Sequence, residues 1–123
     1  MLLHDEVYVK KTLLYHDGEV FGRAVNNSSA LAETVLGQML ICLHGGPKFM
    51  INMVPVANLN ANFLYGQSMM SIDSIENASG KLKAVICDGN RTNQACFKQF
   101  EAIEGKPCRV HGVYFFCTTS FIF

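Results

Sequence analysis

Two aspartates, Asp5 and Asp88, follow apolar runs that are typical of strands. The run Ala84 to Cys87 combines small and β-branched residues, and Gly89 comes directly after Asp88. In open α/β sheets, ligands bind outside the carboxyl ends of the strands. An aspartate at such a position could hold a hydroxyl group or a metal ion. The plainer alternative is that each is a turn residue or the N-cap of a following helix.

A pair of neighbouring aspartates would favour a divalent cation. Two carboxylates that lie close together repel each other, and one of them keeps its proton unless a cation lies between them. Mg²⁺ prefers oxygen ligands, and it commonly takes only one or two carboxylates from the protein. Such ions assist in-line displacement at phosphorus. If Asp5 and Asp88 lie side by side, the sequence therefore predicts metal-assisted cleavage or transfer of phosphodiesters.

The composition is that of a folded domain without a strong electrostatic field. The chain has 123 residues, of which 50% are hydrophobic and 16% are charged, and its formal net charge is zero. This composition argues against a disordered segment and predicts one domain or part of one. Any contact with nucleic acid must therefore depend on a local site. The sequence contains no apolar run of membrane length and no signal peptide pattern.

The five cysteines favour free thiols over a disulfide framework. Their number is odd and no Cys-x-x-Cys pair occurs. This usage predicts a reducing compartment. Cys108 and His111 make up only half of a zinc site, because structural zinc requires four ligands.

The elements that would position the aspartates follow from hydrophobic periodicity and turn residues. The first strand is expected to end on Asp5 and Glu6, and two hairpins are expected to turn at Asp17-Gly18 and at Gly45-Gly46. The remaining expected elements are extended runs over Val7 to Tyr15, Val20 to Val25, Thr34 to Leu43 and Lys48 to Val56; helices over Phe63 to Ala78 and Arg91 to Glu101; and strands over Lys81 to Cys87 and Cys108 to Phe116. This order predicts an α/β fold in which a mixed sheet carries helices on its faces. It also predicts that the first strand lies in the middle of the sheet, beside the later parallel strand.

Several other residues lie near the expected site in the sequence. His4 is expected to pack at the edge of the sheet, with a phosphate contact as the alternative. Glu6 is adjacent to Asp5 and would point to the other face of the strand. The basic residues that could approach the site are Lys10, Lys11 and Arg91.

Three segments together resemble the RNase H-like catalytic domain of P element-type transposases, a group that includes relatives with a THAP zinc finger. The segments are Leu3 to Lys11, the hairpin around Asp17-Gly18, and Val85 to Asn93. The resemblance runs from about Leu2 to Phe116. Its most specific parts are the Asp-Glu pair at Asp5 and the Cys-Asp-Gly-x-x-x-Asn pattern that begins at Cys87.

The resemblance implies a cut-and-paste DNA transposase with three acidic ligands for Mg²⁺ or Mn²⁺. Asp5 matches the first ligand and Asp88 the second, so these two are the implied catalytic residues. The third lies beyond the segment that this chain matches. The resemblance also implies DNA as the partner (transposon ends and target), a nuclear location, and oligomers of the full-length protein.

The C-terminal segment departs from the family pattern. After Val113 to Phe116, Cys117 to Ser120 stand where the family has an Asp-x-x-His-Leu-x-Lys-Asn-like segment. We therefore expect a partial RNase H-like domain over residues 1–116, an aberrant or truncated tail over residues 117–123, and no catalysis by the chain alone. The alternative is a degenerate or domesticated transposon remnant that acts as a non-catalytic interaction module.

Overall fold

A computed structural model describes residues 1–104, 109–110 and 113–118, and the side chains of residues 1–100. The elements in these ranges are β1 (Leu2–Tyr8), β2 (Leu14–His16), β3 (Glu19–Phe21), β4 (Thr34–Ile41), β5 (Lys48–Val56), α1 (Ala61–Asn77), β6 (Ala84–Asp88), α2 (Arg91–Glu104), β7 (Arg109–Val110) and β8 (Val113–Thr118).

Strand β1 lies in the interior of the main sheet, as the sequence predicted. The order of the strands is β5-β4-β1-β6-β8-β7. Strand β1 pairs antiparallel with β4 and parallel with β6. The predicted hairpin over the Gly45-Gly46 turn is confirmed, because β4 and β5 pair antiparallel on either side of it. Pro55 lies in β5 at the end of the strand order, where a residue without an N–H group is tolerated.

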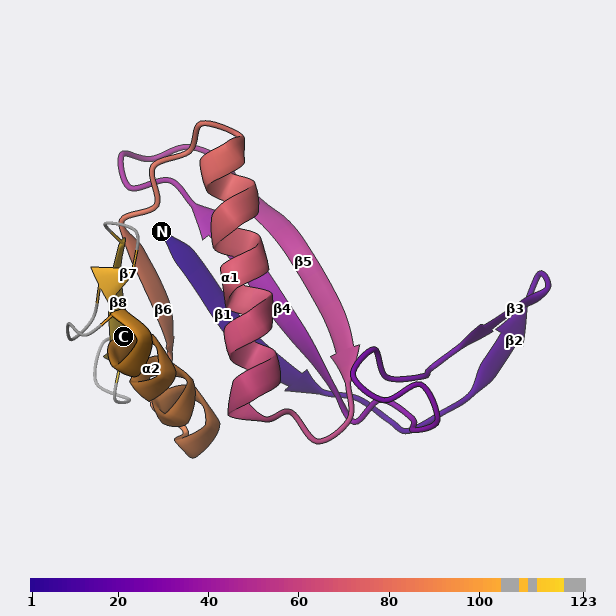
Figure 1. Cartoon of the computed structure of the whole chain (residues 1–123). Coiled ribbons are helices and arrows are strands. Elements are labelled where there is room, and N and C mark those ends of the chain that lie inside the picture. The colour runs from indigo at the N-terminus through magenta and orange to yellow at the C-terminus, as the bar shows by residue number, and fades with distance from the viewer. Residues whose placement is uncertain (105–108, 111–112, 119–123) are drawn as a thin grey trace.

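Both helices cover the same face of this sheet (Figure 1). Helix α1 connects β5 to β6 and α2 connects β6 to β8, and both connections step in the same direction along the strand order. Because such crossovers are right-handed, two steps in one direction place both helices on one side. The mixed α/β fold is thus confirmed, with its described helices on a single face. No helix among the described residues is long and apolar enough to span a bilayer.

The hydrophobic core lies between the helices and this face of the sheet. Buried and more exposed side chains alternate along the strands. Leu2 in β1, Leu36 in β4 and Val54 in β5 are buried and face the helices. The helices and β6 complete the core with Leu64, Ile72, Ile75, Val85, Cys87, Cys96, Phe97 and Phe100, among others. Helix α1 begins where Asn60 caps the Phe63 N–H group, at 2.9 Å, which agrees with the predicted helix to within a few residues.

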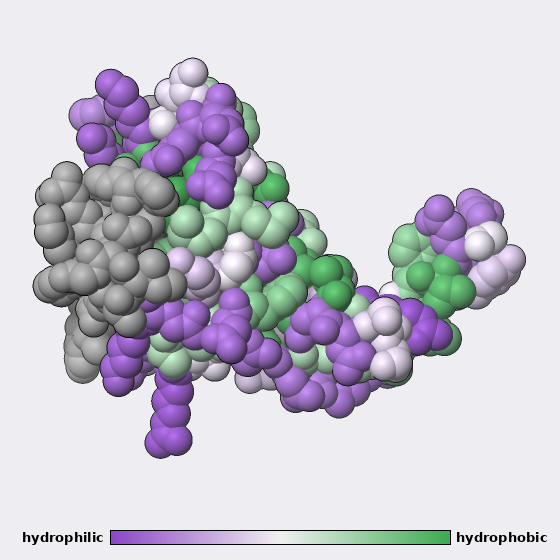
Figure 2. All heavy atoms as spheres, in the orientation of Figure 1, coloured by the Kyte–Doolittle hydropathy of each residue, from purple (hydrophilic) through white to green (hydrophobic). Residues whose placement is uncertain are grey.

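Strands β2 and β3 form a separate two-stranded arm that projects from the body (Figure 1). Its side chains are exposed, and Figure 2 shows hydrophobic residues among them. The expected strand over Val20 to Val25 is too long, because Gly22 leaves the extended conformation at φ +108°. The expected run over Val7 to Tyr15 is likewise divided: β1 ends at Tyr8 and β2 begins at Leu14.

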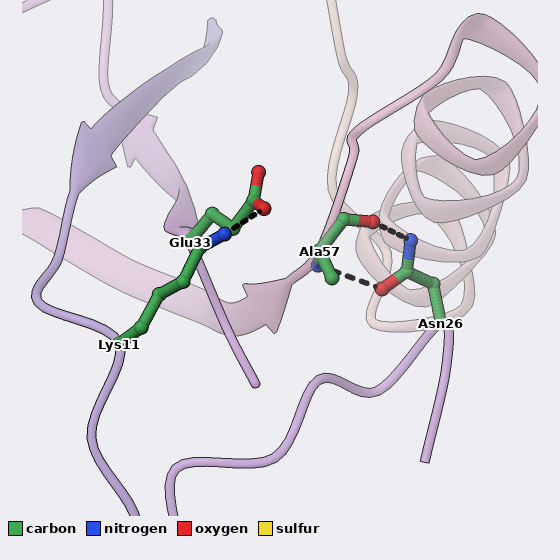
Figure 3. Close-up of polar contacts among 4 residues, drawn as sticks. All are labelled: Lys11, Asn26, Glu33 and Ala57. Carbon is green, nitrogen blue, oxygen red and sulfur yellow. Dashed lines mark hydrogen bonds and ion pairs between the residues drawn. The ribbon is translucent and has the colours of Figure 1, made fainter. Parts of the chain in front are cut away.

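Two polar contacts fasten the base of the arm to the sheet (Figure 3). Before β2, Lys11 forms an ion pair with Glu33 at 2.5 Å. After β3, the Asn26 side chain accepts a hydrogen bond from the Ala57 N–H group at 2.9 Å and donates one to the Ala57 carbonyl oxygen. The arm is therefore anchored at both of its ends.

The expected single strand over Cys108 to Phe116 is wrong, because β7 and β8 are two antiparallel strands. In this ladder Arg109 pairs with Tyr114 and Val110 with Val113. Strand β8 continues to Thr118, beyond the proposed domain boundary at Phe116. The rest of the predicted tail, residues 119–123, lies outside the described residues.

Candidate metal-binding site at the carboxyl edge of the sheet

Asp5 and Asp88 lie on neighbouring parallel strands, Asp88 as the last residue of β6 and Asp5 in the middle of β1. The first strand does not end on Asp5 and Glu6 as expected, because β1 continues past the end of β6 to Tyr8. Leu2 pairs with Val85 and Leu3 with Ile86 in the β1–β6 ladder. The same register, continued by two residues, brings Asp5 level with Asp88. Both side chains are exposed. The fold therefore brings together two residues that are 83 positions apart (88 − 5) in the sequence.

Asp88 is not the N-cap of the following helix, contrary to the simplest alternative from sequence. The cap is Asn90, whose side-chain oxygen accepts the Asn93 N–H group at 2.9 Å. Oδ1 of Asp88 instead accepts two hydrogen bonds: one from the Asn90 N–H group at 3.1 Å and one from Nδ2 of Asn93 at 2.7 Å. The turn after β6 and the first turn of α2 thus each donate one hydrogen bond to the same oxygen of Asp88.

Asp5 is exposed and is held by one described hydrogen bond of its side chain. Its Oδ1 accepts the N–H group of the next residue, Glu6, at 2.8 Å. Its partner across the antiparallel ladder is Gly37 in β4. Because Gly37 has no side chain, nothing from that position covers Asp5 on its face of the sheet. A hydrated cation could therefore approach Asp5 from the exposed face.

Glu6 alternates with Asp5 along β1, but it is electrostatically part of the same site. The pKa of Glu6 is raised, first by partial burial and then by the negative charges of Asp88 and Asp5, while the Asn90 side chain opposes the shift. Glu6 therefore lies within electrostatic range of both aspartates. Strand alternation predicted that Glu6 points away from Asp5, but alternation along β1 does not determine the distance from Glu6 to Asp88 at the end of β6.

His4 lies beneath the aspartates in the core and not at the edge of the sheet. Its side chain is 1% exposed, because β1 is an interior strand covered by the helices. Its ring lies 6.5 Å from that of Phe97 in α2, between centroids. Among the described side chains, neither ring nitrogen has a hydrogen-bond partner of good geometry, although Asn93 lies close enough to affect the pKa of His4. Burial lowers the pKa of His4 to about 4, against the opposing effects of Asn93, Asp88 and Asp5. At neutral pH, His4 is therefore an uncharged core residue.

The three basic residues that were expected near the site differ in their position relative to the two aspartates. Lys11 is paired with Glu33 at the base of the arm. Lys10 and Arg91 are exposed, and Arg91 begins α2 directly after the turn that contains Asp88. Of these residues, Arg91 lies nearest to Asp88 in the sequence, and its place at the start of α2 keeps it next to the candidate site.

The donor atoms suit a hard divalent cation with an incomplete protein shell. Asp5 and Asp88 offer carboxylate oxygens, the ligand type that Mg²⁺ and Mn²⁺ prefer. Among the residues that the structure describes, no group of three or more His, Cys, Asp or Glu side chains could hold a metal ion. A cation at this edge would thus take two protein carboxylates and several waters. The half zinc site at Cys108 and His111 lies outside the described residues. Cys42, Cys87 and Cys96 form no disulfide bond.

A cavity lies at the other end of the sheet from the two aspartates. It measures about 370 Å³ and is lined by residues at the amino ends of β1 and β6, among them Met1, Leu82 and Lys83. The candidate site is therefore an exposed edge and not an enclosed pocket.

Comparison with known proteins agrees with this architecture. The family model described as "TNP-like, RNase H N-terminal domain" matches residues 1–101. The solved structure of the Drosophila P element transposase strand transfer complex contains a chain that superposes with a TM-score of 0.66 and 15% sequence identity. The superposition covers 96% of this chain and 25% of that chain, so the present sequence spans about a quarter of its length. No curated protein matches the sequence.

The RNase H-like fold expected from the short motifs is thereby confirmed. Two asparagines at the site had no role assigned from the sequence: Asn90, and Asn93, which closes the Cys-Asp-Gly-x-x-x-Asn pattern. The spacing of three residues between them is that of an N-cap and the N–H group it accepts, which is a signal that was available in the sequence.

Proposed function

Because this chain belongs to the TNP-like RNase H N-terminal domain family, we propose that it supplies two of the metal-binding carboxylates of a P element-like DNA transposase. Asp5 and Asp88 hold Mg²⁺ or Mn²⁺ in this proposal. The observation that carries it is the register of β1 and β6, which brings the two aspartates level at the carboxyl edge of the sheet.

The reaction we propose is cleavage of a DNA phosphodiester by water, followed by attack of the freed 3′-hydroxyl on target DNA. Each step breaks one phosphorus–oxygen bond and forms another. A bound ion of this kind stabilises negative charge on the phosphoryl oxygens and makes water a better nucleophile. The part of this chain is to orient the ion: the turn after β6 fixes Asp88, and the exposed side chain of Asp5 completes the pair.

The substrates and partners belong to the whole protein. We propose transposon ends and target DNA as the partners, in the nucleus. With only two protein carboxylates at the edge, the 123-residue chain should bind the ion weakly and should not cleave DNA by itself. The neutral net charge agrees with this, since it gives no general attraction to DNA.

The test is a titration of the full chain with Mg²⁺, followed by NMR at the amide groups. We expect selective shifts around Asp5 and Asp88 in the wild type, and loss of these shifts in Asp5→Asn and Asp88→Asn. Asp73→Asn, a change at an exposed residue of α1, is the matched control and should titrate like the wild type. Equal titration of all four proteins would overturn the proposal.

A non-catalytic interaction module is the second candidate. It is favoured by the absence of a three-ligand metal group among the described residues. The arm adds to this argument, since it exposes Leu14, Tyr15 and Phe21 to solvent. In that case the wild type would show no selective response to Mg²⁺, and Asp88→Asn would leave the stability nearly unchanged, because no ion or repulsion depends on the charge.

A further inference from the structure

The turn that carries Asp88 is held by three amide side chains. Asn90 caps α2 through the Asn93 N–H group. Gln94 donates to the Gly89 carbonyl oxygen at 2.6 Å. Nδ2 of Asn93 donates both to the Asp88 carbonyl oxygen, at 3.0 Å, and to Oδ1 of the same residue, at 2.7 Å. Of the three side chains, Asn93 is the one whose hydrogen bonds fix both the backbone and the carboxylate of Asp88.

We propose that Asn93 is the positioning residue of the metal site, which holds the Asp88 carboxylate in the orientation that binds the ion. This inference rests on the proposed function, since it assigns a role towards the ion that Asp5 and Asp88 share.

Burial of Asn93 is the first argument for this role. The residue is 3% exposed and lies on the inward side of α2, where Cys96, Phe97 and Phe100 form part of the core. A buried amide is unfavourable unless its donors are hydrogen-bonded. Its two amide hydrogens match the two acceptors on Asp88. The helix itself does not require this side chain, because its own cap contact uses only the backbone N–H group of Asn93.

Geometry is the second argument. Oδ1 of Asp88 receives a backbone N–H group from the turn and the Asn93 amide from the helix. Donors on two different elements restrict the rotation of the carboxylate about its side-chain bonds before any ion arrives. A ligand that is already oriented loses less conformational entropy when it binds. Outer partners of this type typically change metal affinity about 10- to 100-fold when they are removed.

The experiment compares Asn93→Leu with Gln99→Ala in the full chain. Leucine keeps the branching of asparagine at the γ position, although it is larger, and it cannot donate to Asp88. Gln99 also lies in α2, but its side chain donates to Asn62 and takes no part in the Asp88 turn, so Gln99→Ala is the matched control. We expect the Mg²⁺ dissociation constant from NMR to rise about 10-fold or more in Asn93→Leu and to stay within about twofold of wild type in Gln99→Ala.

The second readout is the side-chain rotamer of Asp88, measured by three-bond NMR couplings without metal. We expect a single χ1 rotamer in the wild type and averaging in Asn93→Leu, a change that a purely structural role in α2 would not produce. Unchanged affinity in a folded Asn93→Leu would overturn the proposal. So would an averaged Asp88 rotamer in the wild type, and this measurement decides the matter even if the variant does not fold.

The same data separate the two proposals. If the wild type does not bind Mg²⁺ at all, the proposed function fails and the positioning role fails with it. If the wild type binds Mg²⁺ and both variants bind equally well, only the role of Asn93 is wrong.

Discussion

At the scale of single residues, the candidate site consists of exposed carboxylates above an uncharged core. Asp5 and Asp88 face solvent, whereas His4, next to Asp5 in the sequence, is buried against Phe97. Proximity to the aspartates does not keep the imidazole charged, because the cost of burial is larger than their attraction. The side chain of His4 is therefore expected to affect stability and not metal binding.

The stability of the fold should depend on pH through His4. The folded pKa is lowered from 6.5 to about 4, so the unfolded chain binds a proton more readily and the fold loses stability as pH falls through this window. The full shift corresponds to about 3 kcal/mol. In urea unfolding, wild type should lose about 2 kcal/mol more than His4→Met between pH 7 and pH 4.5. Parallel pH profiles of the two proteins would show that His4 is not responsible.

At the scale of elements, each helix begins at an asparagine cap, and the two caps provide a comparison. Asn60 starts α1 and Asn90 starts α2 in the same way. Only the start of α2 also follows a turn in which the backbone of the cap residue, Asn90, donates a hydrogen bond to Asp88. The two helices thus begin with the same capping structure, but only the cap of α2 lies next to the candidate metal site.

Replacement of either cap by alanine should reduce stability by about 1 kcal/mol. Thermal or urea unfolding of Asn60→Ala and Asn90→Ala measures this loss. Mg²⁺ affinity should fall only in Asn90→Ala, because loss of its cap loosens the helix start that holds Asn93 against Asp88. An equal effect of the two variants on metal affinity would contradict the assignment of the site to the start of α2.

The arm depends on one close backbone contact at its base. A Cβ atom at Gly22 would lie 1.9 Å from the Thr12 carbonyl oxygen, whereas a Cβ at Gly18, in the turn of the arm, would meet nothing within 4 Å. Both glycines have positive φ, +108° and +84°, so both alanine variants carry backbone strain.

Because only Gly22→Ala also creates a steric clash, the two variants should differ in how much stability they lose. Gly18→Ala should reduce the free energy of unfolding by about 1 kcal/mol, and Gly22→Ala by clearly more, because the strand pair at the base must also move apart. Equal losses in urea unfolding would mean that the base of the arm is not packed as described.

At the scale of the whole molecule, the sequence predicted what local patterns determine. The Gly45-Gly46 turn marked the β4–β5 hairpin, and the order of elements placed β1 beside β6. The burial of His4 and the hydrogen bonds of Asn93 could not be predicted in this way, because they depend on how α2 packs against β1 and β6. The division of the last apolar run into β7 and β8 was missed because its length suits a single strand.

The same scale explains why two distant aspartates can cooperate. Strands β1 and β6 are adjacent and parallel only because the β4–β5 hairpin and α1 return the chain to the centre of the sheet. Each aspartate is unremarkable in its own segment. The register of the ladder makes them a pair.

The most direct test of this pairing uses Mn²⁺ as a paramagnetic probe of the side-chain carboxyl carbons. If one ion is shared, substoichiometric Mn²⁺ should broaden the carboxyl resonances of Asp5 and Asp88 together and to a similar degree, while that of Asp73 stays sharp. Broadening of Asp5 or Asp88 alone, or of all exposed carboxyl groups alike, would contradict a shared ion at this edge of the sheet.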